Sequence, residues 1–162
     1  MSTKENLESA FAGESQANRK YTAFARQADK DGYAGVAKLF RAAAAAETVH
    51  ALNHLRVLGE IRTTDENLKA AIEGETFEHT SMYPGFIDEA QSEDNKQAVR
   101  SFTIANEVEK IHADLYKKAL ADKESTGADY YVCEICGNTV ENEAPDVCPI
   151  CGAPKTQFTL ID

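Results

Sequence analysis

Apolar side chains recur every three or four residues along positions 4–121, a spacing typical of amphipathic α-helices. Glycines and short polar capping residues interrupt this pattern and divide it into four helical segments. Pro84 lies inside the third segment and should kink it. Helices of this length predict a bundle with an extended core. We expect helices at about Lys4 to Lys30, at about Ala34 to Leu58, after a cap at Thr64 or Asp65, and from just after Ser92-Glu93-Asp94 to about Ala121.

The apolar stripe of the second helix contains side chains that are costly to bury. Its members share one helix face and are Val36, Phe40, Ala43, Glu47, His50, His54 and Val57. A buried carboxylate without a partner is very unfavourable unless it is matched or coordinates a metal. A helix turned so that Glu47 faces water would explain a single Glu-x-x-His motif. The case for a metal site therefore depends on whether the motif recurs in the chain.

The second half of the helical region repeats the first half. Glu47 follows Glu14 by 33 residues, and Glu109 follows Glu75 by 34 residues. Duplication of a helical hairpin explains this agreement more simply than chance does. The matching segments are Gly13-Glu14-Ser15 with Gly74-Glu75-Thr76, and Glu47-x-x-His50-Ala51 with Glu109-x-x-His112-Ala113.

The two halves differ by one inserted residue in the third helix. Tyr21 follows Glu14 by seven residues, whereas Tyr83 follows Glu75 by eight. A π-bulge is the local helix distortion that absorbs one extra residue. We therefore predict a π-bulge between Glu78 and Tyr83, and a regular α-helical hydrogen-bond ladder there would refute it.

The repeated motifs match the ligand pattern of a two-metal site in a helical bundle. Such sites take a single glutamate from each of two helices and a Glu-x-x-His pair from each of the other two. Four carboxylates balance the charge of two divalent cations, and mixed oxygen and imidazole ligands suit iron or manganese. The alternative is a set of glutamates that decorate helix surfaces. The six candidate ligands are Glu14, Glu47, His50, Glu75, Glu109 and His112.

Three further residues are candidates for a role near this site, and two histidines are less certain. Glu78 lies on the same helix face as Glu75 and gives one metal a choice of carboxylate. Tyr21 and Tyr83 lie about two turns from the single glutamates. These tyrosines either pack in the core or donate hydrogen bonds to ligand carboxylates. We interpret His54 as a hydrogen-bonded core histidine and His79 as a surface residue.

The tail carries all four cysteines, in the segments Cys133-x-x-Cys136-Gly137 and Cys148-x-x-Cys151-Gly152. About thirty residues are too few to build a sufficient hydrophobic core. A metal bound by four thiolates would supply the missing stability, and two disulfides are the alternative. The polar stretch 121–129 reads as a linker, so we expect a helical domain at 1–124 and a four-cysteine domain at 129–162.

Charge and composition exclude several classes of partner. The net charge of −10, from 17 basic and 27 acidic residues, argues against binding to nucleic acid or to an anionic membrane surface. No run of about 18 apolar residues suggests a membrane span. Residues 1–10 are polar and charged, so no signal peptide is expected. We expect a cytoplasmic protein, in which paired cysteines indicate metal rather than disulfide.

Taken together, these motifs resemble those of the rubrerythrin family over essentially the whole chain. The resemblance implies a mainly α fold, in which a ferritin-like four-helix bundle precedes a small rubredoxin-like domain with short β-strands. Asn138 departs from the pattern, because rubredoxin knuckles often place an aromatic residue there. The residues that carry the resemblance are Gly13-Glu14-Ser15-Gln16-Ala17, Glu47-x-x-His50, Gly74-Glu75-x-x-Glu78-His79-Thr80, Glu109-x-x-His112 and the two Cys-x-x-Cys-Gly segments.

The resemblance further implies two iron ions in a non-haem diiron centre and one iron ion on the four cysteines. It implies reduction of hydrogen peroxide to water in oxidative-stress defence, and among the residues near the site we count Tyr21 and Tyr83 as candidate catalytic groups. One iron of the family shifts between a glutamate and a histidine, here Glu78 and His50. Electrons would come from NADH through a separate reductase or a rubredoxin, since no Gly-x-Gly-x-x-Gly nucleotide loop is present. The family forms homodimers, in which helices can swap between subunits.

Two other functions remain open at the level of sequence. A ferroxidase would use the same bundle to oxidise ferrous iron. A binding protein without enzymatic activity would combine a helical bundle with a structural zinc ribbon. Turnover of peroxide with an electron donor, without accumulation of ferric iron, distinguishes the peroxidase from the ferroxidase. The colour of the purified protein separates iron from zinc on the thiolates.

Overall fold

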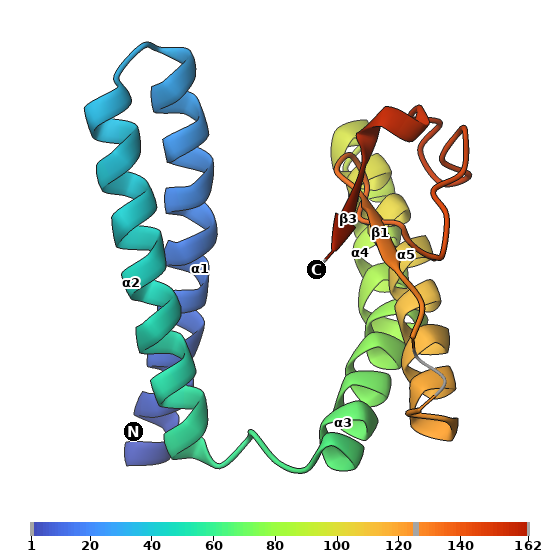
Figure 1. The fold of residues 1–162 in the computed structure, drawn as a ribbon, viewed down its shortest axis with the longest axis horizontal. Coiled ribbons are helices and arrows are strands. Elements are labelled where there is room, and N and C mark those ends of the chain that lie inside the picture. Colours follow the sequence, from blue (N-terminus) through green and yellow to red (C-terminus); the bar gives the residue numbers. More distant parts are fainter. Residues whose placement is uncertain (1, 125–126, 162) are drawn as a thin grey trace. The chain divides into compact units, whose positions relative to one another are not determined.

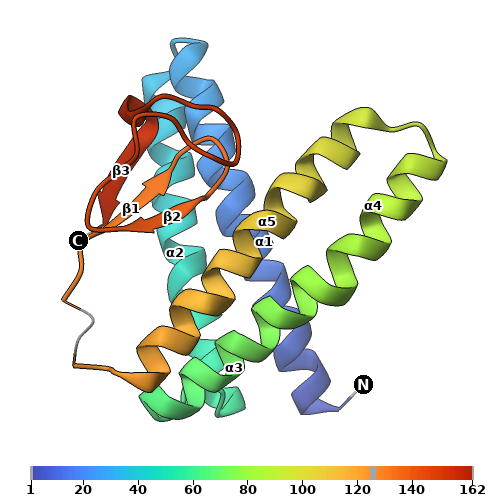
Figure 2. The same cartoon turned by 90° about the vertical axis from the view of Figure 1, so that its right-hand side faces the viewer.

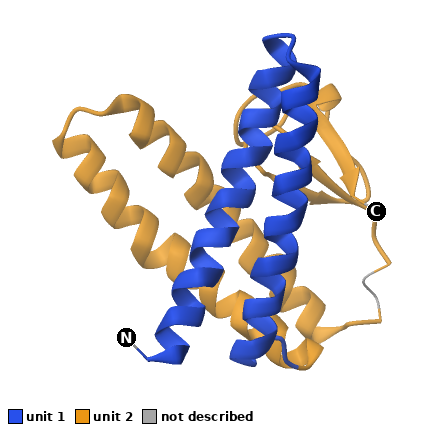
Figure 3. Ribbon diagram, turned by 90° about the vertical axis from the view of Figure 1, so that its left-hand side faces the viewer, with its two compact units in different colours: residues 1–62 blue, residues 63–162 orange. Residues whose placement is uncertain are grey.

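The computed structural model describes residues 2–124 and 127–161 and contains two compact units, residues 1–62 and residues 63–162 (Figure 3). The first unit is a helical hairpin. The second unit contains another helical hairpin followed by the cysteine-rich tail. Within the described ranges, no helix combines the length and the apolar character that crossing a bilayer requires.

The first unit pairs α1 (Thr3–Lys30) with α2 (Ala34–Leu58), the blue and cyan helices of Figure 1. Ser2 and Glu5 form a capping box that satisfies backbone N–H groups at the start of α1. Gly32 and Gly59 adopt positive φ angles at the two helix ends, where a side chain would strain the backbone. The buried residues between the helices are all alanines, so the two backbones approach closely; they are Ala25, Ala28, Ala37, Ala44 and Ala51.

Part of the stripe that we expected in the core stays exposed. Val36 is 46% exposed and Val57 is 70% exposed. The α1–α2 hairpin therefore leaves part of this stripe exposed.

The second unit begins with one continuous helical run, formed by α3 (Thr64–Phe77), the π-helical segment η1 (Glu78–Met82) and α4 (Tyr83–Ser92). It packs against α5 (Lys96–Ala121), which Asn95 caps. The N-cap of α3 is Thr63, not Thr64 or Asp65 as expected. Thr63 is the cap because its hydroxyl and the Glu66 carboxylate form a capping box, in which each side chain accepts a hydrogen bond from the backbone N–H of the other residue.

The π-bulge is confirmed. The backbone N–H of Tyr83 donates to the carbonyl of Glu78, five residues earlier, so the extra residue is contained in η1. Pro84 is the second residue of α4, one position after Tyr83. A proline has no backbone N–H to donate, and the adjacent π-helical segment already interrupts the regular i to i−4 hydrogen-bond ladder.

The tail forms a small antiparallel sheet with the strand order β2-β1-β3 (Figure 2). The strands are β1 (Tyr130–Cys133), β2 (Thr139–Glu141) and β3 (Phe158–Ile161), and the short 3₁₀ turn η2 (Lys155–Gln157) precedes β3. Tyr131 of β1 lies opposite Val140 on one side and Leu160 on the other. The expected fold class is confirmed: a mainly α chain followed by a small β domain. The buried residues of this domain are few and small, namely Cys133, Asn138, Ala144 and Cys148.

Candidate metal centres

The first unit brings together three of the six candidate bundle ligands. Glu14 of α1 and the Glu47–His50 pair of α2 each offer one ligand atom, and these atoms lie within 4.8 Å of one another. The Nδ1 atom of His50 lies 2.9 Å from the Glu47 carboxylate and 3.9 Å from that of Glu14. His50 is 52% exposed, whereas Glu47 is 18% exposed. We call this group the N-terminal half-site.

The second unit builds the same arrangement from Glu75 of α3 and the Glu109–His112 pair of α5. Here too, the histidine Nδ1 atom lies 2.9 Å from one carboxylate and 3.9 Å from the other. We call this group the C-terminal half-site. The equal distances show that the sequence repeat is also a repeat of local geometry.

Each of the two helical hairpins also contains a triad of aromatic rings. Tyr21, Phe24 and Phe40 have ring centroids 5.6 to 6.3 Å apart, and Tyr83, Phe86 and Phe102 have centroids 5.5 to 6.2 Å apart. Such separations are typical of favourable aromatic packing. Both tyrosines therefore have a packing role, and a role for their hydroxyl groups at the metal site stays a prediction.

Negative charges crowd the C-terminal half-site. Burial, the charge of Glu109 and a hydrogen bond shared with Glu109 raise the pKa of Glu75 to about 7. Burial and the charge of Glu109 also raise the pKa of Glu78. Burial and the three carboxylates raise the pKa of the Tyr83 hydroxyl. A divalent cation would relieve this repulsion, and the carboxylate and imidazole donors are those that iron accepts.

Glu78 is near the C-terminal half-site without being part of the converging group. Its charge interacts with Glu109 and His112, yet the three ligand atoms that converge belong to Glu75, Glu109 and His112. His54 and His79 are half-buried and belong to neither group of ligands among the described residues. The union of the two half-sites into one centre stays a prediction, as does the role of Glu78.

The four cysteines of the tail form a third site. Their sulfur atoms lie within 4.8 Å of one another, and all four thiols are free. Cys133 and Cys151 are 3.7 Å apart, and Cys136 and Cys148 are 3.6 Å apart. Both distances exceed the roughly 2 Å of a disulfide bond. This compact group of thiolates fits a tetrahedral metal such as iron or zinc.

Backbone N–H groups surround these sulfur atoms. Burial opposes ionisation of Cys148, but N–H groups of Cys151 and Ile150 donate to its sulfur and lower the pKa to about 7. Burial raises the pKa of Cys136, although the N–H of Asn138 donates to its sulfur. Burial also raises the pKa of Cys151. The fold therefore stabilises the thiolate form that metal binding requires at Cys148.

The family models match both parts of this architecture. The Rubrerythrin model matches residues 5–120, and the model described as Rubrerythrin, rubredoxin-like domain matches residues 131–159. The chain belongs to the rubrerythrin family. A diiron site with glutamate and histidine ligands and a rubredoxin-like four-cysteine site are therefore the metal sites of this rubrerythrin, and both donor sets are present.

Relatives align with nearly the whole length of this chain. Nigerythrin from Nitratidesulfovibrio vulgaris is 40% identical over 173 residues, which span 98% of this chain and 86% of the relative. Rubrerythrin-2 from Clostridium acetobutylicum is 36% identical over 174 residues, which span 96% of this chain and 95% of the relative. Solved structures of nigerythrin in mixed-valent and all-ferrous states are 39% identical, with a TM-score of 0.60 over 99% of this chain and 87% of theirs.

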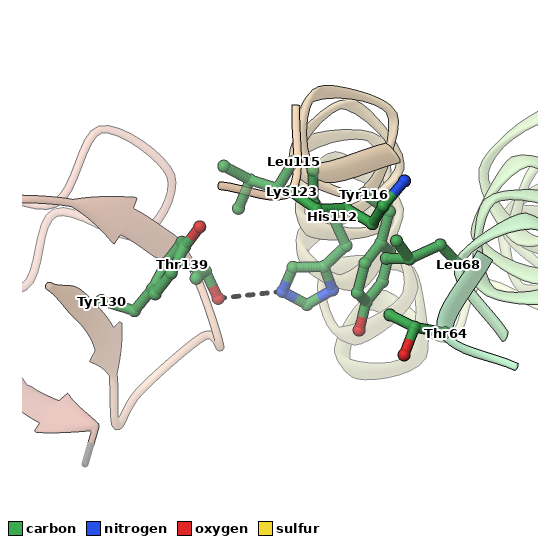
Figure 4. Close-up of a pocket in the computed structure, with 9 residues that line it drawn as sticks. Thr64, Leu68, His112, Leu115, Tyr116, Lys123, Tyr130 and Thr139 are labelled. Atoms are coloured by element: carbon green, nitrogen blue, oxygen red, sulfur yellow. Dashed lines mark hydrogen bonds between the residues drawn. The ribbon is translucent and has the colours of Figure 1, made fainter. Parts of the chain in front are cut away.

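One contact at the C-terminal half-site was not predicted from the sequence. The Nε2 atom of His112 lies 2.9 Å from the hydroxyl oxygen of Thr139, the first residue of β2 (Figure 4). Both residues line a cavity of about 500 Å³, with Leu68, Leu115 and Tyr130 among its apolar neighbours. The two residues are 27 positions apart and lie in different sequence motifs, so no local pattern could have indicated their contact.

Proposed function

We propose that this rubrerythrin reduces hydrogen peroxide to water and that the two half-sites together hold the diiron centre. The observation that carries the proposal is the equal geometry of the half-sites, each with one histidine and two carboxylates on adjacent helices. Six ligands of this kind suit two iron ions. The ions would supply the electrons for cleavage of the O–O bond and would stabilise the charge that develops on oxygen.

The protein residues have separate roles in this reaction. Glu14, Glu47, His50, Glu75, Glu109 and His112 would hold the two ions. Peroxide takes up two protons and two electrons as it becomes two water molecules. Burial and neighbouring carboxylates raise the pKa values of Glu78 and of the Tyr83 hydroxyl, which favours the protonated forms of both groups. We assign them, with Tyr21 at the equivalent position of the first unit, as groups that donate protons or hydrogen bonds.

Electrons would reach the diiron centre through an iron ion on Cys133, Cys136, Cys148 and Cys151. A separate reductase, linked to NADH, or a rubredoxin would reduce that iron one electron at a time. Reduced thiols of this kind persist in the cytoplasm, where we place the protein.

The short connection between the units favours a homodimer with exchanged hairpins. Ferritin-like bundles contain one long crossover connection, which would return the chain along the bundle between α2 and α3. Glu47 and Glu75 each lie 11 residues from the facing helix end, Leu58 or Thr64, so such a crossover would span about 33 Å. The connection at residues 59–63 reaches at most about 20 Å. We therefore propose that each diiron centre combines the N-terminal half-site of one copy with the C-terminal half-site of another.

Peroxide turnover tests the proposed activity. With iron in all sites and a reductase as donor, the protein should consume peroxide catalytically without accumulating ferric iron. Glu78→Ala should fold normally and turn over more slowly, whereas Glu89→Ala, at an exposed position of α4, should match the wild type. Oxidation of added ferrous iron without donor-dependent peroxide turnover would support a ferroxidase instead. Unchanged peroxide kinetics in Glu78→Ala would remove Glu78 from its proposed role.

Mixing two inactive variants tests the exchanged dimer. One variant carries His50→Ala and Glu47→Ala, and the other carries His112→Ala and Glu109→Ala. After unfolding and joint refolding, an exchanged heterodimer contains one intact diiron site and regains activity. If each copy combines its own half-sites, every site in the mixture is damaged and activity stays absent.

A further inference from the structure

Thr139 connects the four-cysteine site with the C-terminal half-site. Its hydroxyl group donates a hydrogen bond to the carbonyl oxygen of Gly137, at 3.1 Å, and lies 2.9 Å from Nε2 of His112. Gly137 directly follows Cys136, one of the four thiolate ligands of the tail. The contact lies entirely within the second unit, where the ring of His112 points toward β2 (Figure 4).

Counting protons assigns the state of the histidine ring. A hydroxyl group has one hydrogen, which Thr139 gives to Gly137, so its oxygen is left to accept. The Nε2 atom of His112 must therefore carry a hydrogen and donate it. In the neutral ring, Nδ1 then presents a lone pair at 2.9 Å from the carboxylate of Glu109. Two acceptors at this distance repel each other unless a cation lies between them.

We propose that Thr139 is a positioning residue that fixes the Nε2–H tautomer of His112 and so aims Nδ1 at the metal. The proposal rests on the assignment of His112 as a diiron ligand. Outer hydrogen bonds of this kind orient a metal-bound imidazole and raise its basicity. The same bridge joins the two metal centres by covalent bonds and two hydrogen bonds, through Cys136, Gly137, Thr139 and His112.

The N-terminal half-site provides an internal comparison. His50 has the same distances from its two carboxylates, yet among the described residues its Nε2 atom has no hydrogen-bond partner. It is also more exposed, at 52% against 28% for His112. The proposed bridge therefore distinguishes two ligands that the repeat otherwise makes equivalent.

Exchange of the ring N–H proton tests the bridge without depending on enzymatic activity. We would load the full chain with zinc in all sites and measure exchange of the histidine ring protons with solvent by NMR. The chain has four histidines, so the signals are few. Thr139→Val should accelerate exchange at His112 at least tenfold and leave His50 unchanged. Thr139→Ser, which keeps the hydroxyl, should behave as the wild type.

The metal affinity of the bundle provides the second measurement. Loss of such a supporting hydrogen bond typically weakens metal affinity 10- to 100-fold, so Thr139→Val should bind Mn²⁺ that much more weakly after zinc has filled the thiolate site. Equal protection of the His112 ring proton in the wild type and Thr139→Val would overturn the proposal. A peroxidase that fails as a whole, with His112 protection still dependent on Thr139, would refute the proposed function and leave the bridge intact.

A separate observation concerns Asn138, the residue before Thr139. Asn138 is 1% exposed, and its side-chain nitrogen lies 3.6 Å from the sulfur of Cys148. Its amide oxygen is buried and has no hydrogen-bond partner among the residues that the structure describes. A buried amide oxygen of this kind is unfavourable for folding. The amide must face the sulfur with its N–H₂ group, because a thiolate only accepts hydrogen bonds.

We infer that Asn138 raises the reduction potential of iron bound to the four cysteines. Ferric iron with four thiolates carries one negative charge, and gain of one electron adds a second. A hydrogen bond to sulfur stabilises the more negative, reduced form. An aromatic or aliphatic residue at this position would have no such donor.

Spectroelectrochemical titration of the thiolate-bound iron tests this inference. Asn138→Leu keeps the branched shape of the side chain without a donor, and Asn138→Ala removes the donor with a smaller side chain that cannot clash. Both should shift the reduction equilibrium toward the ferric form by about tenfold, equal to 59 mV for a one-electron couple. Retention of the ferric–thiolate absorption shows that the site is formed. Potentials equal to that of the wild type in both variants would overturn the inference.

Discussion

The substitution Glu75→Gln should affect stability in opposite directions with and without metal. Glutamine resembles the protonated carboxylic acid, which burial and Glu109 favour at this position. The pKa of Glu75 is raised from 4.5 to about 7. A raised pKa means that its contribution to stability is fully present below pH 4.5 and is lost as the pH rises through 7. Without metal on the carboxylates, the wild type should therefore lose stability across this interval, and Glu75→Gln should lose less, because only the contribution of neighbouring groups such as Glu78 remains.

The magnitude follows from the size of the pKa shift. At 1.36 kcal/mol per pKa unit, the full shift corresponds to about 3.4 kcal/mol. The side chain of Glu75 is still 21% exposed, so solvent screens part of the interaction, and we expect about 2 kcal/mol. In a chain of this size, that difference raises the melting temperature of metal-free Glu75→Gln at pH 8 by about 4–8 °C.

Urea unfolding between pH 4.5 and 8.5 measures this effect, with one equivalent of zinc added to fill the thiolate site. Glu73→Gln removes the same charge from the exposed face of α3 and is the matched control. With iron or Mn²⁺ bound, Glu75→Gln should instead be less stable than the wild type, because it lacks a ligand. A metal-free Glu75→Gln whose stability falls with pH in parallel with the wild type would refute the reasoning.

Three further predictions concern the elements that build the site. Thr63→Ala removes the capping box of α3 and should destabilise the second unit by about 1 kcal/mol in urea unfolding, whereas Thr63→Ser should not. Deletion of Thr80 removes the extra residue of η1 and should leave calorimetric Mn²⁺ binding intact, because the first unit forms the same half-site with a regular α1; loss of binding would contradict this. Cys148→Ser should abolish the ferric–thiolate absorption and the β signal in circular dichroism, since the tail has a very small core.

Much of the fold could be predicted because its signals are local. The end of α2 at Leu58 and the π-helical segment follow from a glycine and from a one-residue difference in spacing. The N-cap of α3 was missed, although the spacing of Thr63 and Glu66 is that of a capping box. Three consecutive residues can cap a helix here. The hydrogen bond that the Glu66 carboxylate accepts from the backbone of Thr63 determines which of them is the cap.

The ligands of the site could be predicted from the sequence, but the residues that surround those ligands could not. Spacing along helices placed the carboxylates and imidazoles, because residues three apart share a face. The contact between Thr139 and His112 depends on how the tail packs against α5, which no periodicity reveals. The burial of Asn138 likewise depends on the knuckle as a whole, where the sequence showed only a departure from an aromatic residue.

The duplicated hairpin gives the protein two half-sites with the same ligand types and the same ligand distances. The surroundings of the two half-sites differ. The Nε2 atom of His112 is hydrogen-bonded to Thr139, so the ring would have little freedom to turn away from an ion bound at Nδ1. His50 has equal ligand distances but a ring that is half exposed and free at Nε2 among the described residues. Under the proposed function, we therefore expect His50 to be the histidine that an ion can release more readily. The exchange of His50 for Glu78, which resemblance to the family implies, stays a prediction. Repetition supplies the ligands, and the tail, which follows only one of the two hairpins in the chain, would make two bound ions chemically distinct.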